Sequence, residues 1–153
     1  IMLEFKLKDI KDMTLKEKIG QIVMCGFLSD YYDDDIKSMV EDYGLANVIL
    51  FTRNYKNANQ MKKLCTSLHK NIMDNCGTMP LISIDQEGGT VTRMMKEVTF
   101  APSAMSIGAS KEENGAYEAG RVLGRDMIML GINMDLAPVL EIIRLYCVQS
   151  CSK

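Results

Sequence analysis

Residues 81–94, LISIDQEGGTVTRM, place a short apolar run directly before a polar loop that contains a paired glycine. The run Leu81–Ile84 is short, apolar and rich in β-branched residues, which predicts a buried strand. Asp85, Glu87 and Arg93 follow it within nine residues. The stretch therefore predicts a strand whose carboxyl end opens into a loop with charged side chains, and the surrounding sequence decides which kind of sheet carries it.

Two further apolar runs predict strands of the same sheet, NVILF at residues 47–51 and INMDLAPVL at residues 132–140. Amphipathic helical patterns precede and separate the three runs, at residues 14–27, 33–44, 57–77 and 110–131. The first and last of these patterns begin with capping-box spacings, Thr14 with Glu17 and Ser110 with Glu113. Alternation of helices with continuously apolar strands predicts an α/β fold with a parallel sheet covered by helices.

Polar residues at the ends of the three predicted strands favour a barrel over an open dinucleotide-binding sheet. The first strand continues into TRNYKN, which lacks the glycine-rich turn of a dinucleotide-binding fold. In a (β/α)8 barrel of the TIM type, functional groups gather at the carboxyl ends of the strands. All three strands fit this pattern, since they end at Arg53 and Asn54, at Asp85 and Glu87, and at Asp135.

The charged loop has three chemical interpretations. Asp85 and Arg93 suit the recognition of vicinal hydroxyls, because a carboxylate accepts hydrogen bonds while a guanidinium donates them in a fixed fork. Asp85 and Glu87 could instead act as the acid and nucleophile of a hydrolase, although a nearby arginine keeps carboxylates ionised and so disfavours a general acid. A purely structural network is the third interpretation. Asp135 is either a ligand-facing group or a cap of the loop.

Composition excludes several partner classes and sets expectations for the compartment. A net charge of −2, no tryptophan and 7% aromatic residues argue against nucleic acid and anionic membrane surfaces as partners. Five cysteines without a C-x-x-C pair predict neither a disulfide framework nor a zinc site, so we expect no metal and a reducing, cytoplasmic compartment. We find no apolar run long enough for a transmembrane helix. The chain begins at Ile1, so a secreted or surface form with an upstream signal peptide stays open.

Four stretches carry a resemblance to a known family. IDQEGGTVTRM resembles the signature of family 3 glycoside hydrolases, in particular the β-N-acetylglucosaminidase (β-N-acetylhexosaminidase) group. TLKEKIGQIVMCGF, VILFTRNYKN and AGRVLGRDMIMLGINMDLAPVLEI are similar to the family's opening helix, its first strand and loop, and its following helix and strand. The matches run in order across residues 13–142, which makes them more specific than any single motif.

The resemblance implies a TIM-type barrel that hydrolyses terminal β-linked N-acetylglucosamine with retention of configuration. Such enzymes act on peptidoglycan fragments or chitooligosaccharides and use no metal or cofactor. The family's early aspartate and arginine bind sugar hydroxyls, and they match Asp85 and Arg93 here. Two alternatives are a β-glucosidase or β-xylosidase of the same family and a carbohydrate-binding remnant without catalysis.

The chain departs from the family pattern in length and in its last residues. A complete barrel takes about 250 residues, whereas about three strand–helix units are predicted here. Residues 143–153 match nothing in the family, and neither its nucleophile nor its acid/base has a counterpart, so we predict no catalytic residue. Residues 1–153 are therefore expected to be the N-terminal portion of a barrel domain with a divergent tail, inactive in isolation and prone to aggregate through an open sheet edge.

Overall fold

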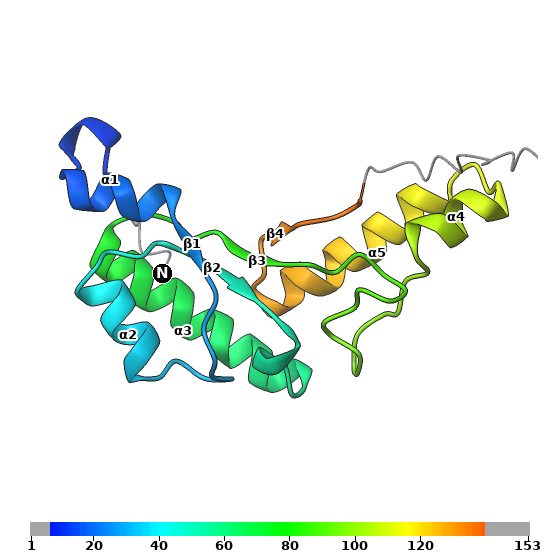
Figure 1. Ribbon diagram of the computed structural model, residues 1–153, viewed down its shortest axis with the longest axis horizontal. Coiled ribbons are helices and arrows are strands. Elements are labelled where there is room, and N and C mark those ends of the chain that lie inside the picture. The colour runs from blue at the N-terminus through cyan, green and yellow to red at the C-terminus, as the bar shows by residue number, and fades with distance from the viewer. Residues whose placement is uncertain (1–6, 140–153) are drawn as a thin grey trace, which may run out of the picture.

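Four short parallel strands form the sheet in the computed structural model, which describes residues 7–139. They are β1 (Met24–Cys25), β2 (Asn47–Leu50), β3 (Ile82–Ile84) and β4 (Met134–Asp135), and they lie in the order β1-β2-β3-β4 (Figure 1). Each strand therefore pairs with the next one along the chain. A doubly wound sheet reverses its strand order at a switch point, whereas a barrel adds strands in one direction. The topology is that of a partial TIM-type barrel.

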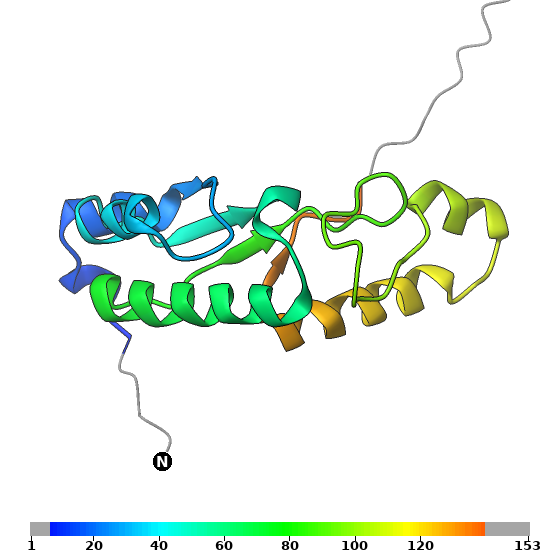
Figure 2. The same ribbon diagram turned by 90° about the horizontal axis from the view of Figure 1, so that it is seen from below.

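Helices cover the sheet and connect its strands. The helical elements are η1 (Ile10–Asp12), α1 (Leu15–Ile22), α2 (Asp34–Glu41), η2 (Thr52–Asn54), α3 (Ala58–Cys76), α4 (Ala104–Ser110) and α5 (Gly115–Leu130). Connecting helices α2, α3 and α5 pack side by side, with α3 between the other two. Figure 2 shows α3 and α5 running along the same side of the strands. This one-sided helical layer is what right-handed crossovers between parallel strands produce.

The core lies between the sheet and α3. Val48, Leu50, Ile82 and Ile84 are fully buried, as the apolar runs predicted. From α3, the side chains that face them recur at helical spacing and include Met61, Leu64, Leu68 and Ile72. Asn57 caps the first turn of this helix through its side chain, and Gly77 ends it in the left-handed conformation. Both helix boundaries agree with the sequence prediction.

Two asparagine side chains fasten the amino-terminal ends of the strands. Asn47 Oδ1 accepts the Leu81 N–H (3.1 Å), and its Nδ2 donates to Gln21 O (2.7 Å). Asn133 repeats the arrangement one strand further on, accepting from Ile82 N–H (2.8 Å) and donating to Pro80 O (2.8 Å). Each carboxamide thus satisfies backbone groups that the short strands leave without a ladder partner.

The first strand was missed by the sequence prediction, which continued the opening helix to Phe27. Helix α1 ends at Ile22, and Met24 pairs with Asn47 in the sheet. The predicted inward face of this helix is also wrong, because Ile19 and Ile22 are 49% and 83% exposed. The buried position is Gly20, at which the helix backbone lies directly against the turn before β2. The sheet accordingly has four strands among the described residues rather than three.

The helix predicted to begin at Ser110 is two helices. Ser110 is the last residue of α4, and its hydroxyl donates to Ile107 O (2.7 Å) rather than capping a new helix. Lys111 adopts a left-handed conformation with φ 57°, which stops α4. Helix α5 then begins after Asn114 and ends at Gly131, as predicted. The capping-box spacing at Ser110 was therefore misleading.

The outer edges of the four-stranded sheet belong to β1 and β4. Several large apolar side chains are exposed on the helices, among them Leu15, Ile22, Met105, Ile128 and Met129. These features are consistent with the expected tendency to associate, which stays a prediction. The expected divergent tail at residues 143–153 lies outside the described residues. Between residues 7 and 139, no helix combines the length and apolarity needed to cross a membrane.

Two glycine-to-alanine substitutions inside helices should have opposite effects on stability. A Cβ at Gly20 would lie 1.8 Å from the Gly44 carbonyl oxygen, whereas a Cβ at Gly124 meets nothing within 4 Å. We expect Gly20→Ala to destabilise by about 1–3 kcal/mol through overpacking. Gly124→Ala should stabilise by about 0.5–1 kcal/mol through reduced backbone entropy. Urea unfolding at low micromolar concentration measures both, and equal effects would contradict the close packing of α1.

Candidate functional site at the carboxyl ends of the strands

An ion pair between Asp85 and Arg93 lies at the carboxyl end of β3. The loop folds back so that Arg93 Nη2 is 2.9 Å from Asp85 Oδ2. The two side chains are 22% and 30% exposed, so the pair is largely shielded yet reachable from solvent. The ion pair holds both groups in a fixed orientation.

The end of β2 supplies an aromatic ring and a second arginine. The guanidinium carbons of Arg53 and Arg93 lie 4.5 Å and 5.7 Å from the centroid of the Phe51 ring. Arg53 Nε donates to Phe27 O (2.8 Å), which directs this side chain toward the loop after β1. Asn54 is fully buried and donates to the carbonyl of Phe27 as well. Of the two polar residues predicted at this strand end, Arg53 borders the site and Asn54 supports the neighbouring loop.

Gln86 is the residue that sequence reasoning missed. Its side chain is 1% exposed, and its Oε1 accepts the N–H groups of Arg93 (2.8 Å) and Met94 (3.1 Å). Its Nε2 donates to Met94 O (3.2 Å). The Gln86 carboxamide therefore holds the backbone of the loop at Arg93 and Met94, and so places Arg93 opposite Asp85. Strand periodicity is the signal that could have found it, since Ile82, Ile84 and Gln86 fall on one face.

Asp135 anchors the loop from β4. Its Oδ1 accepts the Gln86 N–H at 2.9 Å, so of the two roles predicted for it the loop-capping contact is present. Burial raises the pKa of Asp135 above its usual value of 3.8, and the negative charges of Asp85 and Glu87 act in the same direction. The Gln86 N–H opposes these effects. Asp135 is therefore a carboxyl group held where its ionised form is disfavoured.

Glu87 faces a different part of the molecule from the Asp85–Arg93 pair. Together with Asp135 it lines a cavity of about 350 Å³ between α4, α5 and the end of β4. Its own backbone N–H donates to Val91 O (3.0 Å), within the turn of the loop. Asp85 contacts Arg93, whereas Glu87 lines the cavity. This separation fits a ligand-binding role of the loop better than a role of Asp85 and Glu87 as a catalytic carboxylate pair.

The paired glycine is required by packing. A Cβ on Gly88 would lie 2.5 Å from Pro102 O, and one on Gly89 would lie 2.6 Å from Ser103 Cβ. Both residues also have positive φ, 84° and 59°, which only glycine adopts without strain. The glycines thus let the turn of the loop pack directly against residues 101–103, which lead into α4.

The loop is attached to helices on both flanks. Glu97 Oε2 accepts the Ala58 N–H (3.0 Å) at the start of α3, and Glu97 itself has φ 58°. On the other flank, the Thr99 N–H donates to Asp126 Oδ2 (2.6 Å) on α5. The Tyr55 hydroxyl donates to Lys96 O beside the first contact. A ligand that binds Arg93 therefore meets a surface whose backbone is already fixed.

No cluster of three or more histidine, cysteine, aspartate or glutamate side chains is placed to hold a metal within residues 7–139. Three cysteines of this region, Cys25, Cys65 and Cys76, are free thiols, and burial raises the pKa of Cys65 to about 12. Cys147 and Cys151 lie outside the described residues.

Comparison with known proteins assigns the family. Residues 14–146 match the family described as the glycosyl hydrolase family 3 N terminal domain. The chain belongs to glycoside hydrolase family 3. The β-hexosaminidase of Haemophilus influenzae is 35% identical to this family 3 chain over 102 residues, which are 64% of the chain and 28% of the relative. β-Hexosaminidase A of Pseudoalteromonas piscicida is 33% identical over 113 residues, or 71% and 19% of the two chains.

Solved structures agree with the fold of the family 3 chain. A family 3 β-N-acetylglucosaminidase from Paenibacillus superimposes with a TM-score of 0.79 and 40% identity, covering 82% of this chain and 24% of that one. NagZ from Neisseria gonorrhoeae superimposes with a TM-score of 0.66 and 28% identity, covering 78% and 36%. The family 3 chain thus spans less than two fifths of the length of each of these proteins.

Replacing Gln86 with leucine should release the arm of the loop that carries Arg93. The substitution leaves two N–H groups and a carbonyl without their partner, so we expect a loss of about 1–3 kcal/mol in stability. Hydrogen exchange at the Arg93 and Met94 amides should accelerate more than exchange at core amides of α3. Thr90→Val, at an exposed position of the same loop, is the matched control. Unchanged protection of both amides in Gln86→Leu would contradict the role given to the carboxamide.

Asp135→Asn should become more stabilising as the pH rises. Because the folded pKa of Asp135 lies above its usual value of 3.8, protonation favours the folded chain at acid pH. That contribution is lost as the pH increases through the raised pKa, while asparagine keeps an acceptor for the Gln86 N–H and carries no charge. Urea unfolding at about pH 3.5 and pH 7 compares the two proteins. A stability difference that is the same at both values would show that the pKa is not raised.

Proposed function

We propose that this chain supplies the sugar-binding part of a glycosidase that removes terminal β-linked N-acetylglucosamine. The Asp85–Arg93 ion pair at the carboxyl ends of the strands is the observation that carries the proposal. The names of the family relatives, β-hexosaminidase and β-N-acetylglucosaminidase, support the class of substrate. Peptidoglycan fragments and chitooligosaccharides are the proposed natural sources of that sugar.

The geometry favours binding of hydroxyl groups by the pair. Asp85 keeps acceptor capacity beyond its contact with Arg93, because an ionised carboxylate has about four lone-pair positions. Arg93 uses Nη2 for Asp85, and its Nε is buried without a partner among the described residues. A sugar with adjacent hydroxyls can receive a hydrogen bond from the guanidinium and donate another to the carboxylate. Such paired recognition selects both the position and the direction of the hydroxyls.

Catalysis is proposed to belong to other residues of the complete barrel. Retaining glycosidases use two carboxyl groups about 5–5.5 Å apart, one of them able to hold a proton. Asp85 is fixed to Arg93 and Asp135 to the Gln86 N–H, so both act here as positioned acceptors. We therefore assign no nucleophile or acid/base to residues 7–139. The Asp85–Arg93 pair without these groups would also serve a carbohydrate-binding remnant, which is the second candidate function.

The compartment is part of the proposal. The free thiols of Cys25, which is partly buried, and of the buried Cys65 and Cys76 support a reducing, cytoplasmic location.

Binding of N-acetylglucosamine to the 153-residue chain tests the role of the pair. We expect Asp85→Ala and Arg93→Ala to weaken binding at least about tenfold in calorimetric titrations, because each removes a charge-assisted hydrogen bond. Arg121→Ala is the matched control, since Arg121 forms an exposed pair with Glu118 on α5. Equal affinities of Arg93→Ala and Arg121→Ala for N-acetylglucosamine would contradict the proposed binding role.

Hydrolysis separates the two candidate functions. A longer form of the protein that contains the complete barrel should release the chromogen from an aryl β-N-acetylglucosaminide, and Asp85→Ala should abolish this release. A sugar-induced rise in melting temperature without any hydrolysis would select the binding remnant instead.

A further inference from the structure

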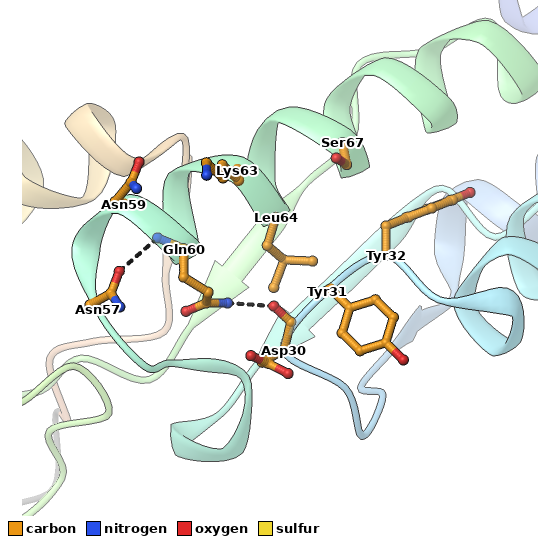
Figure 3. A pocket seen from close by; sticks show the side chains of 9 residues that line it. All are labelled: Asp30, Tyr31, Tyr32, Asn57, Asn59, Gln60, Lys63, Leu64 and Ser67. Carbon is orange, nitrogen blue, oxygen red and sulfur yellow. Dashed lines mark hydrogen bonds between the residues drawn. The ribbon is translucent and has the colours of Figure 1, made fainter.

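A second hollow lies on the helical layer, away from the Asp85–Arg93 pair. It has a volume of about 340 Å³ and opens between α3 and the loop that follows β1 (Figure 3). Asn59, Lys63 and Ser67 line it from α3, each four residues after the last, so they form one stripe along the helix. Asp30 and Tyr31 line it from the loop. The volume is within the range of about 300–1,000 Å³ typical of small-ligand sites.

The base of the hollow is fixed by hydrogen bonds. Gln60 Nε2 donates to Asp30 O (2.5 Å) and Asn54 O (3.0 Å), and the first of these contacts is drawn in Figure 3. Gln60 Oε1 accepts the Lys56 N–H at 2.9 Å. Lys56 Nζ lies 2.6 Å from Asp30 Oδ2. The loop and the helix are therefore joined before any ligand arrives, which lowers the entropy lost on binding.

The remaining polar groups around the hollow are available. Within the part of the chain that the structure describes, Asn59, Lys63, Ser67 and the Tyr31 hydroxyl have no side-chain hydrogen bond or ion pair. The Tyr31 side chain is 63% exposed, so its ring offers an open aromatic surface beside these groups. An amide, an ammonium, a hydroxyl and a phenol together can both donate and accept hydrogen bonds.

We propose that this hollow is a second carbohydrate-binding position, which takes one or two neutral pyranose units. The electron-rich face of Tyr31 packs against the polarised C–H groups of a sugar ring, while Asn59, Lys63 and Ser67 bind its hydroxyls. The Asp30 carboxylate and the Lys63 ammonium lie at the same hollow, so it has no single charge that would select an anion or a cation. Apolar side chains form a minor part of its lining, which disfavours a lipid.

The position differs from the proposed catalytic-side site in its place on the fold. Tyr31 lies in the loop after β1 and the stripe lies on α3, whereas Asp85 and Arg93 follow β3 at the carboxyl ends of the strands. A saccharide in the hollow would hold a polymeric substrate on the surface of the protein rather than present its terminal unit for cleavage. Saccharide binding in the hollow is independent of the Asp85–Arg93 pair, whereas the role in holding a polymeric substrate rests on the proposed function.

Nuclear magnetic resonance titration of the 15N-labelled 153-residue chain tests the second position. N,N′-diacetylchitobiose and cellobiose are the probes. We expect saturable shifts of the Tyr31, Asn59, Lys63 and Ser67 amides with at least one disaccharide, and we expect them to persist in Arg93→Ala. Tyr31→Ala should weaken this binding at least about tenfold. Tyr43→Ala, which truncates a tyrosine that is 67% exposed after α2, should leave it unchanged.

A second variant tests whether Tyr31→Ala weakens binding only because it disturbs the fold. Asn59 is an exposed residue in the first turn of α3, where alanine is a good helix former, so Asn59→Ala should keep the helix and still weaken binding. The proposal is overturned if neither disaccharide shifts the four amides. It is also overturned if their shifts disappear in Arg93→Ala, or if Tyr31→Ala and Tyr43→Ala bind equally well. If the unsubstituted chain binds a saccharide in the hollow beside Tyr31 but not at the Asp85–Arg93 pair, the proposed function is rejected and the second position is retained.

Discussion

The position of Arg93 depends on one buried carboxamide. Gln86 follows β3 directly, and its side chain turns into the core to accept two backbone N–H groups of the returning arm. A buried amide has a strict requirement for partners, because each unpaired polar atom is destabilising. The loop satisfies that requirement in the conformation that places Arg93 beside Asp85. The Asp85–Arg93 pair is thus a consequence of satisfying a buried carboxamide that both donates and accepts hydrogen bonds.

The parallel sheet brings the other supports to the same place. Because β3 and β4 run in the same direction, the carboxyl end of β4 puts Asp135 next to the Gln86 N–H. Helices α3 and α5, which precede β3 and β4 in the chain, supply Ala58 and Asp126 as attachment points for Glu97 and Thr99. The left-handed backbone at Glu97 is a local strain that these contacts offset. Strand direction, helix ends and loop conformation therefore act together on a single pair of side chains.

The sequence predicted the secondary-structure elements that depend on local patterns of residues. It did not predict the elements that depend on contacts with residues distant in the chain. The strand at Ile82–Ile84 and the helix from Asn57 to Gly77 are predicted by apolar periodicity, caps and a terminal glycine. By contrast, β1 has two residues and exists because Met24 meets Asn47 in the sheet, a contact that no local pattern contains. The spacing at Ser110 matches a capping box, but a left-handed residue at Lys111 ends the helix there.

The same distinction applies to the candidate site. Asp85 and Arg93 were predictable because charged residues after a strand, close to paired glycines, indicate a ligand-facing loop. Their mutual contact was inferred from chemistry and is present in the structure. Gln86 was overlooked because a neutral amide between two acids attracts less attention than its neighbours. Which of two roles Asp135 plays could be decided only by seeing the backbone that its carboxylate contacts.

The asparagines that fasten the opposite ends of the strands separate two kinds of evolutionary change. Asn47 and Asn133 hold the sheet together at its amino-terminal side, whereas the loop with Asp85 and Arg93 lies at the carboxyl-terminal side. Selection for thermal tolerance can act through the first group without altering ligand contacts. Substitutions in the loop can change ligand contacts while the asparagine contacts keep the strands in register. A lineage built on this fold can therefore alter its ligand contacts and its working temperature independently.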